Sequence, residues 1–195
     1  VDKDAAVAYD PEGAKQLLAS AGWVDTNGDG YVDKNGSPLE IVWLTYTSRQ
    51  ELPKLAEYAQ AVLKDVGIKV KVNATDSWKN YITSGDYDIF ANAFVTAPQG
   101  DPQYYITTHL LDSSSYNRGF YHNDTVERLT SQLRTTFDTK QRAQLAEQIQ
   151  AEVLKDNGYY YASFLEMSLV MKSNVTGLVA HPSDYYEITA NLNMK

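Results

Sequence analysis

Oxygen-bearing side chains alternate through the segment Asp25–Asp33, a spacing that could surround a cation. Asp25, Asn27 and Asp29 match positions 1, 3 and 5 of a calcium-binding EF-hand loop. Gly30 follows at position 6, where that loop needs a glycine, but position 12 holds a second glycine in place of a bidentate glutamate. Two interpretations stay open: a calcium-stabilised structural or adhesion module, or an acidic turn that holds a hairpin. We expect the turn rather than a bound calcium ion.

Imidazole side chains are the next candidates for metal binding. The chain has three histidines, His109, His122 and His181, and none of them share the HxxxH or HExxH spacing of a metal-binding helix. A histidine outside such a motif is more often a surface residue or a hydrogen-bonded core residue. His109 and His122 lie on the two sides of a polar loop, so we take these two as the candidate metal ligands.

The residue pattern does not favour covalent catalysis. A nucleophile needs an adjacent base and an orienting group, yet no serine stands in a GxSxG turn and the chain has no cysteine. Glycine-rich loops that could cradle a phosphate are absent as well. A pair of carboxylates for glycoside hydrolysis is a spatial arrangement, so a hydrolase stays open as a third hypothesis. We expect a binding protein rather than an enzyme.

A dense loop signal, Thr96–Asp101, follows a largely apolar segment that we predict to be a strand over 87–95. In open α/β sheets, ligands bind in the crevice beyond the carboxyl ends of the strands. Polar groups in this loop and in segment 116–121 would supply hydrogen bonds, a planar guanidinium for a carboxylate, and tyrosine walls. The alternative is a packed corner in which the aspartate caps the next helix. The candidate ligand-binding residues are Thr96, Asp101, Tyr104, Tyr116, Asn117, Arg118 and Tyr121.

Strands and helices alternate in the first half of the chain, which predicts an α/β fold. We expect the strand over 87–95 to be central in its sheet, because it is largely apolar. Ser48 and Glu51 predict a capping box at the start of a long helix. In the first half we expect a helix over 11–21, a hairpin over 24–37 with a short strand near 31–32, strands over 39–47 and 68–72, and helices over 48–66 and 77–84. In the second half we expect a helix over 103–110, two further helices, and one or two strands within 159–172. One face of the first of the two further helices is expected to be lined by Val126, Leu129, Leu133 and Phe137.

Composition limits the class of protein. A chain of 195 residues with 43% hydrophobic residues is large enough for one packed domain. The formal charge of -8 argues against nucleic acid as a partner, because phosphate binding needs a basic face. No apolar run approaches the roughly 18 residues of a membrane-spanning helix.

Short motifs occur along the chain in an order that resembles one protein family. They are YDPEGAKQLLASAGW, PLEIVWL, DVGIKV, WKNYITSGDYDIF, GDPQYY and YNRGFYHNDTVERL. This order is similar to the C-terminal lobe of the family 5 solute-binding proteins of bacterial ABC importers. The resemblance implies one lobe of a periplasmic-binding-protein type II fold, with a mixed sheet flanked by helices. It also implies that residues 1–195 form a single domain, without the N-terminal portion of the two-lobe protein.

The resemblance further implies a receptor outside the cytoplasm, either periplasmic or a cell-surface lipoprotein. Such a receptor closes its two lobes, of which the N-terminal one is absent here, around the ligand and delivers it to a membrane permease. Ligands in the family include peptides and nickel, the latter often as a chelate. Many peptide-binding members carry an acidic residue shortly before the Asp-Pro pair to receive the amino terminus of the peptide, and segment 94–100 of this chain has none. We therefore expect a nickel chelate before a peptide, with nickel as cargo and no resident cofactor.

Overall fold

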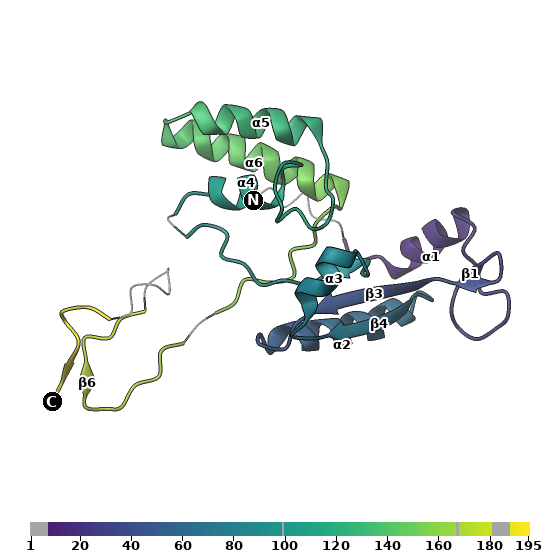
Figure 1. The fold of residues 1–195 in the computed structure, drawn as a ribbon, viewed down its shortest axis with the longest axis horizontal. Coiled ribbons are helices and arrows are strands. Elements are labelled where there is room, and N and C mark those ends of the chain that lie inside the picture. Colours follow the sequence, from purple (N-terminus) through teal and green to yellow (C-terminus); the bar gives the residue numbers. More distant parts are fainter. Residues whose placement is uncertain (1–7, 99, 167, 181–187) are drawn as a thin grey trace.

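The computed structural model describes residues 8–98, 100–166, 168–180 and 188–195 (Figure 1). Strands and helices alternate in the first half, and helices dominate the second. No helix in these ranges is long and apolar enough to cross a membrane. The elements are α1 Pro11–Ser20, β1 Asp33–Lys34, β2 Ser37–Pro38, β3 Glu40–Thr45, α2 Glu51–Lys64, β4 Lys69–Ala74, α3 Trp78–Ser84, β5 Ile89–Phe90, α4 Gln103–His109, α5 Asp124–Thr135, α6 Thr139–Asp156, β6 Val175–Thr176 and β7 Asn193–Met194.

β3 is the central strand of a three-stranded parallel sheet in the order β4-β3-β5. Trp43 of β3 pairs with Val72 on one side and with Ile89 on the other. Leu44, the next residue, is fully buried, as expected for a strand with neighbours on both sides. The expected α/β class, with a sheet flanked by helices, is confirmed.

β5 differs from its predicted form. The prediction that the strand over 87–95 would be central is wrong, because β5 contains only Ile89 and Phe90 and lies at an edge of the sheet. The Phe90 side chain is covered by other rings instead of by a further strand. Phe90 stacks on Trp78 of α3, with ring centroids 5.5 Å apart.

Helix α2 packs against the sheet and covers the first hydrophobic cluster. The capping box predicted from Ser48 is wrong: α2 begins at Glu51, and its N-cap residue Gln50 makes no side-chain capping bond. Ser48 thus lies outside the first turn and cannot reach the orphan N–H groups. The helix is held by burial of Leu52 and Ala56. We call this the sheet cluster; its buried members are Trp43, Tyr46, Leu52, Ala56, Val70 and Ala91.

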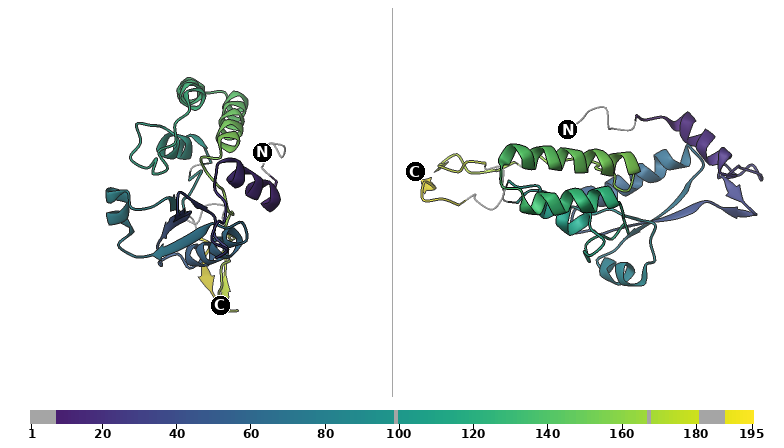
Figure 2. Two further views of the ribbon diagram at one scale, coloured as in Figure 1. Left: turned by 90° about the vertical axis from the view of Figure 1, so that its right-hand side faces the viewer. Right: turned by 90° about the horizontal axis from the view of Figure 1, so that it is seen from above.

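Helices α4, α5 and α6 form a second layer with a core of its own (Figure 2). Two side chains cap the longer helices: Asn123 accepts the N–H of Val126, and Asp138 accepts the N–H of Gln141. The helical cluster shares no buried residue with the sheet cluster. Its buried members are Ile106, Leu110, Tyr121, Val126, Leu129, Leu133, Ala146, Ile149 and Val153.

Phe137 is the exception among the residues predicted for this core. Val126, Leu129 and Leu133 are buried as predicted, but Phe137 is 89% exposed. The helical spacing ends too early to place it, because α5 stops at Thr135 and the next residue, Thr136, is extended with φ of -98° and ψ of 125°. Phe137 therefore stands in the turn between α5 and α6.

Beyond α6 the chain first passes beside the helical layer, where Tyr159 packs against its core, and then runs away from both layers (Figure 1). The prediction of one or two strands within 159–172 is wrong for the residues described there, none of which is in a strand. The following pair, β6 and β7, is antiparallel and joins Val175 to Met194. His181 lies outside the described residues.

Candidate functional site

We call β1 to β5 with α1 to α3 the sheet half, and α4, α5 and α6, with the loops between them, the helical half. Arg118 lies in the polar loop between α4 and α5, where this loop meets the sheet half. Its guanidinium carbon is 5.0 Å from the ring centroid of Trp78, 5.4 Å from that of Phe90 and 5.1 Å from that of Tyr116. Trp78 comes from α3, Phe90 from β5 and Tyr116 from the loop itself. Aromatic faces attract cations, so these rings form an aromatic cage that stabilises the guanidinium.

Among the described residues, the guanidinium of Arg118 has no acidic partner. Within the described ranges it takes part in no ion pair, and its Nε atom is buried without a hydrogen-bond partner. Its backbone is fixed, because the Tyr87 hydroxyl donates a 2.7 Å hydrogen bond to the Arg118 carbonyl. A planar guanidinium without a carboxylate is a ready partner for an anionic group of a ligand.

His109, the last residue of α4, lies beside this cage. It is 6% exposed, and its ring centroid is 4.1 Å from that of Phe94 and 4.8 Å from that of Tyr105. Burial first, and the nearby Arg118 charge second, lower the pKa of His109 to about 4. The ring is therefore neutral near pH 7. Its Nδ1 atom is 3.0 Å from the Thr108 hydroxyl, whereas its buried Nε2 atom has no partner in the part of the chain that is described.

Asp101 is fully engaged inside the protein. Its carboxylate accepts hydrogen bonds from Nη2 of Arg142 at 2.6 Å, from Nε of Arg142 at 3.1 Å and from the N–H of Gln103 at 2.8 Å. Arg142 also donates to the carbonyls of Leu133 and Thr136, at 2.8 and 2.7 Å. The Asp101–Arg142 pair thus ties the loop before α4 to the turn between α5 and α6.

Asn117 and Tyr121 brace the polar loop from within. The Asn117 side chain donates to the Tyr121 carbonyl at 2.7 Å and accepts its N–H at 3.0 Å. Tyr121 is 6% exposed in the helical cluster, and its hydroxyl donates to Asp156 at 2.8 Å. Both residues are occupied by internal hydrogen bonds.

The remaining predicted residues present open surface. Tyr104 and Tyr116 are about half exposed, and Tyr104 stacks on Phe94 with ring centroids 5.8 Å apart. Thr96 is half-buried in the segment between β5 and α4. The structure thus brings Tyr116 and Arg118 together with His109, while Tyr104 joins them through Phe94. Their contact with a ligand stays a prediction.

His122 lies in a different environment from His109. The exposed ring places Nδ1 2.6 Å from the Asp112 carboxylate and Nε2 3.4 Å from that of Asp124. The hydrogen bond that this ring donates to the Asp112 carboxylate, together with the negative charge of Asp112, raises the pKa of His122. In the described ranges no group of three or more histidine, cysteine, aspartate or glutamate side chains is placed to hold a metal ion.

The acidic turn uses its own oxygens to hold its shape. Asp25 accepts the N–H groups of Gly28 and Gly30, at 2.7 and 2.9 Å. Asp33 accepts the N–H and the hydroxyl of Thr26, at 2.9 and 2.7 Å. The hairpin strand follows as β1, two residues later than the predicted strand near 31–32. The arrangement is that of a self-bonded turn before a hairpin.

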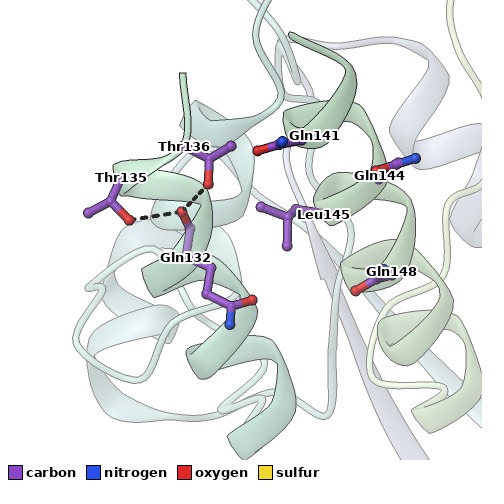
Figure 3. A pocket seen from close by; sticks show the side chains of 7 residues that line it. All are labelled: Gln132, Thr135, Thr136, Gln141, Gln144, Leu145 and Gln148. Atoms are coloured by element: carbon purple, nitrogen blue, oxygen red, sulfur yellow. Dashed lines mark hydrogen bonds between the residues drawn. The ribbon is translucent and has the colours of Figure 1, made fainter. Parts of the chain in front are cut away.

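A separate open groove of about 350 Å³ runs between α5 and α6 (Figure 3). Its walls are uncharged, and none of the predicted site residues line it. The lining residues are Gln132, Thr135, Thr136, Gln141, Gln144, Leu145 and Gln148.

Sequence reasoning missed Trp78, Tyr87 and Arg142 as partners of the site. Arg142 is 41 residues from Asp101, and Trp78 precedes Arg118 by a similar stretch of chain. No local spacing links such residues, so only the three-dimensional arrangement reveals them.

Comparison with known proteins shows that the chain is similar to bacterial extracellular solute-binding proteins. A family model described as bacterial extracellular solute-binding proteins, family 5 middle, matches residues 1–117. The oligopeptide-binding protein AppA of Bacillus subtilis is 29% identical over 92% of this chain. The nickel-binding protein NikA of Staphylococcus aureus is 29% identical over 91% of this chain. Each match spans 34% of the relative, so the chain is about a third of their length.

Solved structures give the same result. A structure of NikA from Staphylococcus aureus in complex with Ni(L-His)2 matches with a TM-score of 0.75, at 25% identity, over 95% of this chain and 38% of that one. AppA from Bacillus subtilis in complex with a nonapeptide matches with a TM-score of 0.64, at 30% identity, over 77% of this chain and 31% of that one.

Proposed function

Because the chain belongs to the family 5 bacterial extracellular solute-binding proteins, we propose that its parent protein captures a small solute outside the cytoplasm and delivers it to the permease of an ABC importer. The chain supplies one wall of the ligand cleft as the C-terminal lobe, and the rest of the parent protein supplies the other. The work is binding without covalent change. The receptor is periplasmic or anchored to the cell surface as a lipoprotein.

The uncompensated charge of Arg118 is the observation that carries the proposal. The cage of Trp78, Phe90 and Tyr116 holds the guanidinium where no side chain of the described residues neutralises it. The ligands named for two relatives, a nonapeptide and Ni(L-His)2, both contain carboxylates. Arg118 therefore receives a carboxylate of the solute, with Tyr104 and Tyr116 as exposed walls and Thr96 at the rim.

We propose a nickel chelate as the first candidate solute and a peptide as the second. A peptide brings a cationic amino terminus that needs an acidic partner, and segment 94–100 contains none. Asp101 is a poor substitute, because its carboxylate already binds Arg142. His109, neutral and with a buried Nε2 atom that has no partner among the described residues, lies beside Arg118 and is the better placed of the two candidate metal ligands. Both ring nitrogens of His122 already face carboxylates.

The calcium alternative gains no support from the geometry. The oxygens of Asp25 and Asp33 that a calcium ion would need already accept hydrogen bonds from Thr26, Gly28 and Gly30. Calcium would have to displace these bonds and would still lack the bidentate glutamate.

Native mass spectrometry of the full-length parent protein, purified from cells and paired with metal analysis, tests the proposal. We expect an adduct that contains nickel and a small carboxylate. A ladder of peptide masses would replace nickel with peptide as the solute. A protein free of any adduct, which also fails to bind nickel with L-histidine or trialanine in calorimetry, would contradict solute capture.

A further inference from the structure

The aromatic cage of Arg118 is anchored in the sheet half of the molecule. Trp78 stacks on Phe90 at 5.5 Å and 23°, and Tyr46 lies 5.5 Å from Trp78 on the same network of rings. Tyr46 belongs to the buried sheet cluster, and Trp78 and Phe90 pack against it. The two rings that Arg118 meets on this side are therefore held by the core of the sheet and not by the loop that carries the arginine.

Arg118 itself comes from the helical half. The loop around it is closed by the paired hydrogen bonds between Asn117 and Tyr121, and Tyr121 is buried in the helical cluster. The hydrogen bond from the Tyr87 hydroxyl to the Arg118 carbonyl connects the two halves at this point. Burial raises the pKa of Tyr87, so its hydroxyl stays protonated and remains a donor.

The cage leaves only one part of the guanidinium free. Nε is buried among the rings without a partner, whereas the two terminal nitrogens are not buried and make no hydrogen bond within the described residues. These nitrogens are the fork that binds a carboxylate. A guanidinium fixed against aromatic faces loses less freedom on binding than a mobile one, so fixing it in advance raises affinity.

We propose that Trp78 and Tyr87 are positioning residues of the solute site, acting through Arg118 without a contact of their own to the solute. Trp78 fixes the plane of the guanidinium by its ring face, and Tyr87 fixes the backbone of Arg118 by its hydroxyl. This inference rests on the function proposed above, in which Arg118 receives a carboxylate of the solute. Side chains of the sheet half then determine how tightly Arg118, which belongs to the helical half, binds the solute.

Variants of Trp78 in the full-length parent protein test the proposal. Calorimetry with nickel and L-histidine, and separately with trialanine, measures affinity for the probe that the parent binds. Trp78→Leu removes the ring face and should weaken binding roughly three- to thirty-fold, the range expected for loss of a cation–π contact. Trp78→Phe keeps a ring face and should restore most of that loss. Tyr87→Phe removes only the hydroxyl and should weaken binding by a smaller factor.

A second readout detects the cage without any solute. In protein labelled with 15N-arginine, the Hε resonance of Arg118 can be identified by its loss in Arg118→Lys. The aromatic rings should shift this resonance, and the Hε proton should exchange slowly with solvent. Trp78→Leu should abolish both properties, and Trp78→Phe should retain them. Tyr46→Phe is the matched control, because it keeps every ring of the network and removes only a hydroxyl that bonds Asn92 and the Ala93 N–H and does not touch Arg118. It should lower stability and leave both the Hε resonance and the affinity nearly unchanged.

The outcomes separate this inference from the proposed function. If Arg118→Ala weakens binding but Trp78→Leu does not, the positioning role is overturned and the solute contact stands. An unchanged Hε resonance in Trp78→Leu would overturn the cage itself. If Arg118→Ala leaves affinity intact while the Hε resonance still responds to Trp78, the cage exists but the proposed solute contact is wrong.

Discussion

Two arginines of this chain occupy opposite situations. Arg142 donates to the Asp101 carboxylate, to the Gln103 side chain and to the carbonyls of Leu133 and Thr136. Arg118 is surrounded by rings, meets no carboxylate in the described residues, and keeps its terminal nitrogens free. The hydrogen bonds of Arg142 hold α4 against the α5–α6 turn, whereas the terminal N–H groups of Arg118 have no hydrogen-bond partner in the described residues.

This difference distinguishes an arginine that stabilises the fold, Arg142, from an arginine that is a candidate for binding a ligand, Arg118. The sequence alone shows both only as arginines. Buried polar groups in folded proteins are nearly always paired, so a fixed but unpaired charge calls for an external partner. The contact of Asp101 with the ligand stays a prediction, and its carboxylate is already paired with Arg142. Arg118 keeps the property on which its prediction was based.

Arg142→Ala should have the largest effect on stability. The substitution leaves the half-buried Asp101 without its cation and two carbonyls without their donor, so we expect a loss of roughly 2–4 kcal/mol. Urea unfolding of the full-length parent protein measures it. Arg134→Ala, an exposed arginine in the last turn of α5, is the control and should change stability little. A loss below about 1 kcal/mol for Arg142→Ala would break the comparison.

His109 should make the Arg118 region sensitive to acid. The pKa of His109 is lowered from 6.5 to about 4 in the folded state. Between these pH values the unfolded chain therefore binds a proton at His109 that the folded chain does not bind. Stability should therefore fall by roughly 2–3 kcal/mol as the pH drops from 6.5 to 4, with no contribution from this group above pH 7. Unfolding of parent and His109→Phe at a series of pH values measures the difference.

His122 gives the control of opposite sign. Its folded pKa is raised, so any contribution is present at low pH and is lost as the pH rises through that value. His122→Gln should therefore leave the acid-induced loss intact. Arg118→Ala should raise the pKa of His109, because the nearby cation helps to lower it. An acid profile of His109→Phe identical to that of the parent would show that His109 is not the group responsible.

The helices were predictable from local chemistry, and the pairing of distant residues was not. Asp10 accepts the N–H of Gly13 at 2.8 Å, which explains why the Asp-Pro pair marked the start of α1 correctly. The edge position of β5 was missed because an apolar run indicates burial without telling what covers it. Phe137 was missed because helical spacing does not show where a helix ends. The fold class was accessible, whereas the cage of Arg118 depends on contacts between the two halves.

Calcium should have the smallest effect. Asp25→Asn weakens the acceptance of the Gly28 and Gly30 N–H groups, and we expect a loss of about 1 kcal/mol. Since the turn bonds to itself, neither calcium nor a chelator should change the melting temperature of the parent protein. A rise with calcium that Asp25→Asn abolishes would revive the calcium-stabilised module and make the acidic turn a third region to explain.

The most direct test crosses the two arginines in one experiment on the full-length parent protein. Calorimetry with nickel and L-histidine, or with trialanine, gives the affinity, and thermal unfolding gives the stability of each variant. We predict that Arg118→Ala weakens binding by about tenfold or more with little change in stability, the effect of one lost charge-assisted contact. Arg142→Ala should do the reverse, with a lower melting temperature and nearly unchanged affinity below it. Loss of affinity in Arg142→Ala together with intact affinity in Arg118→Ala would contradict the account.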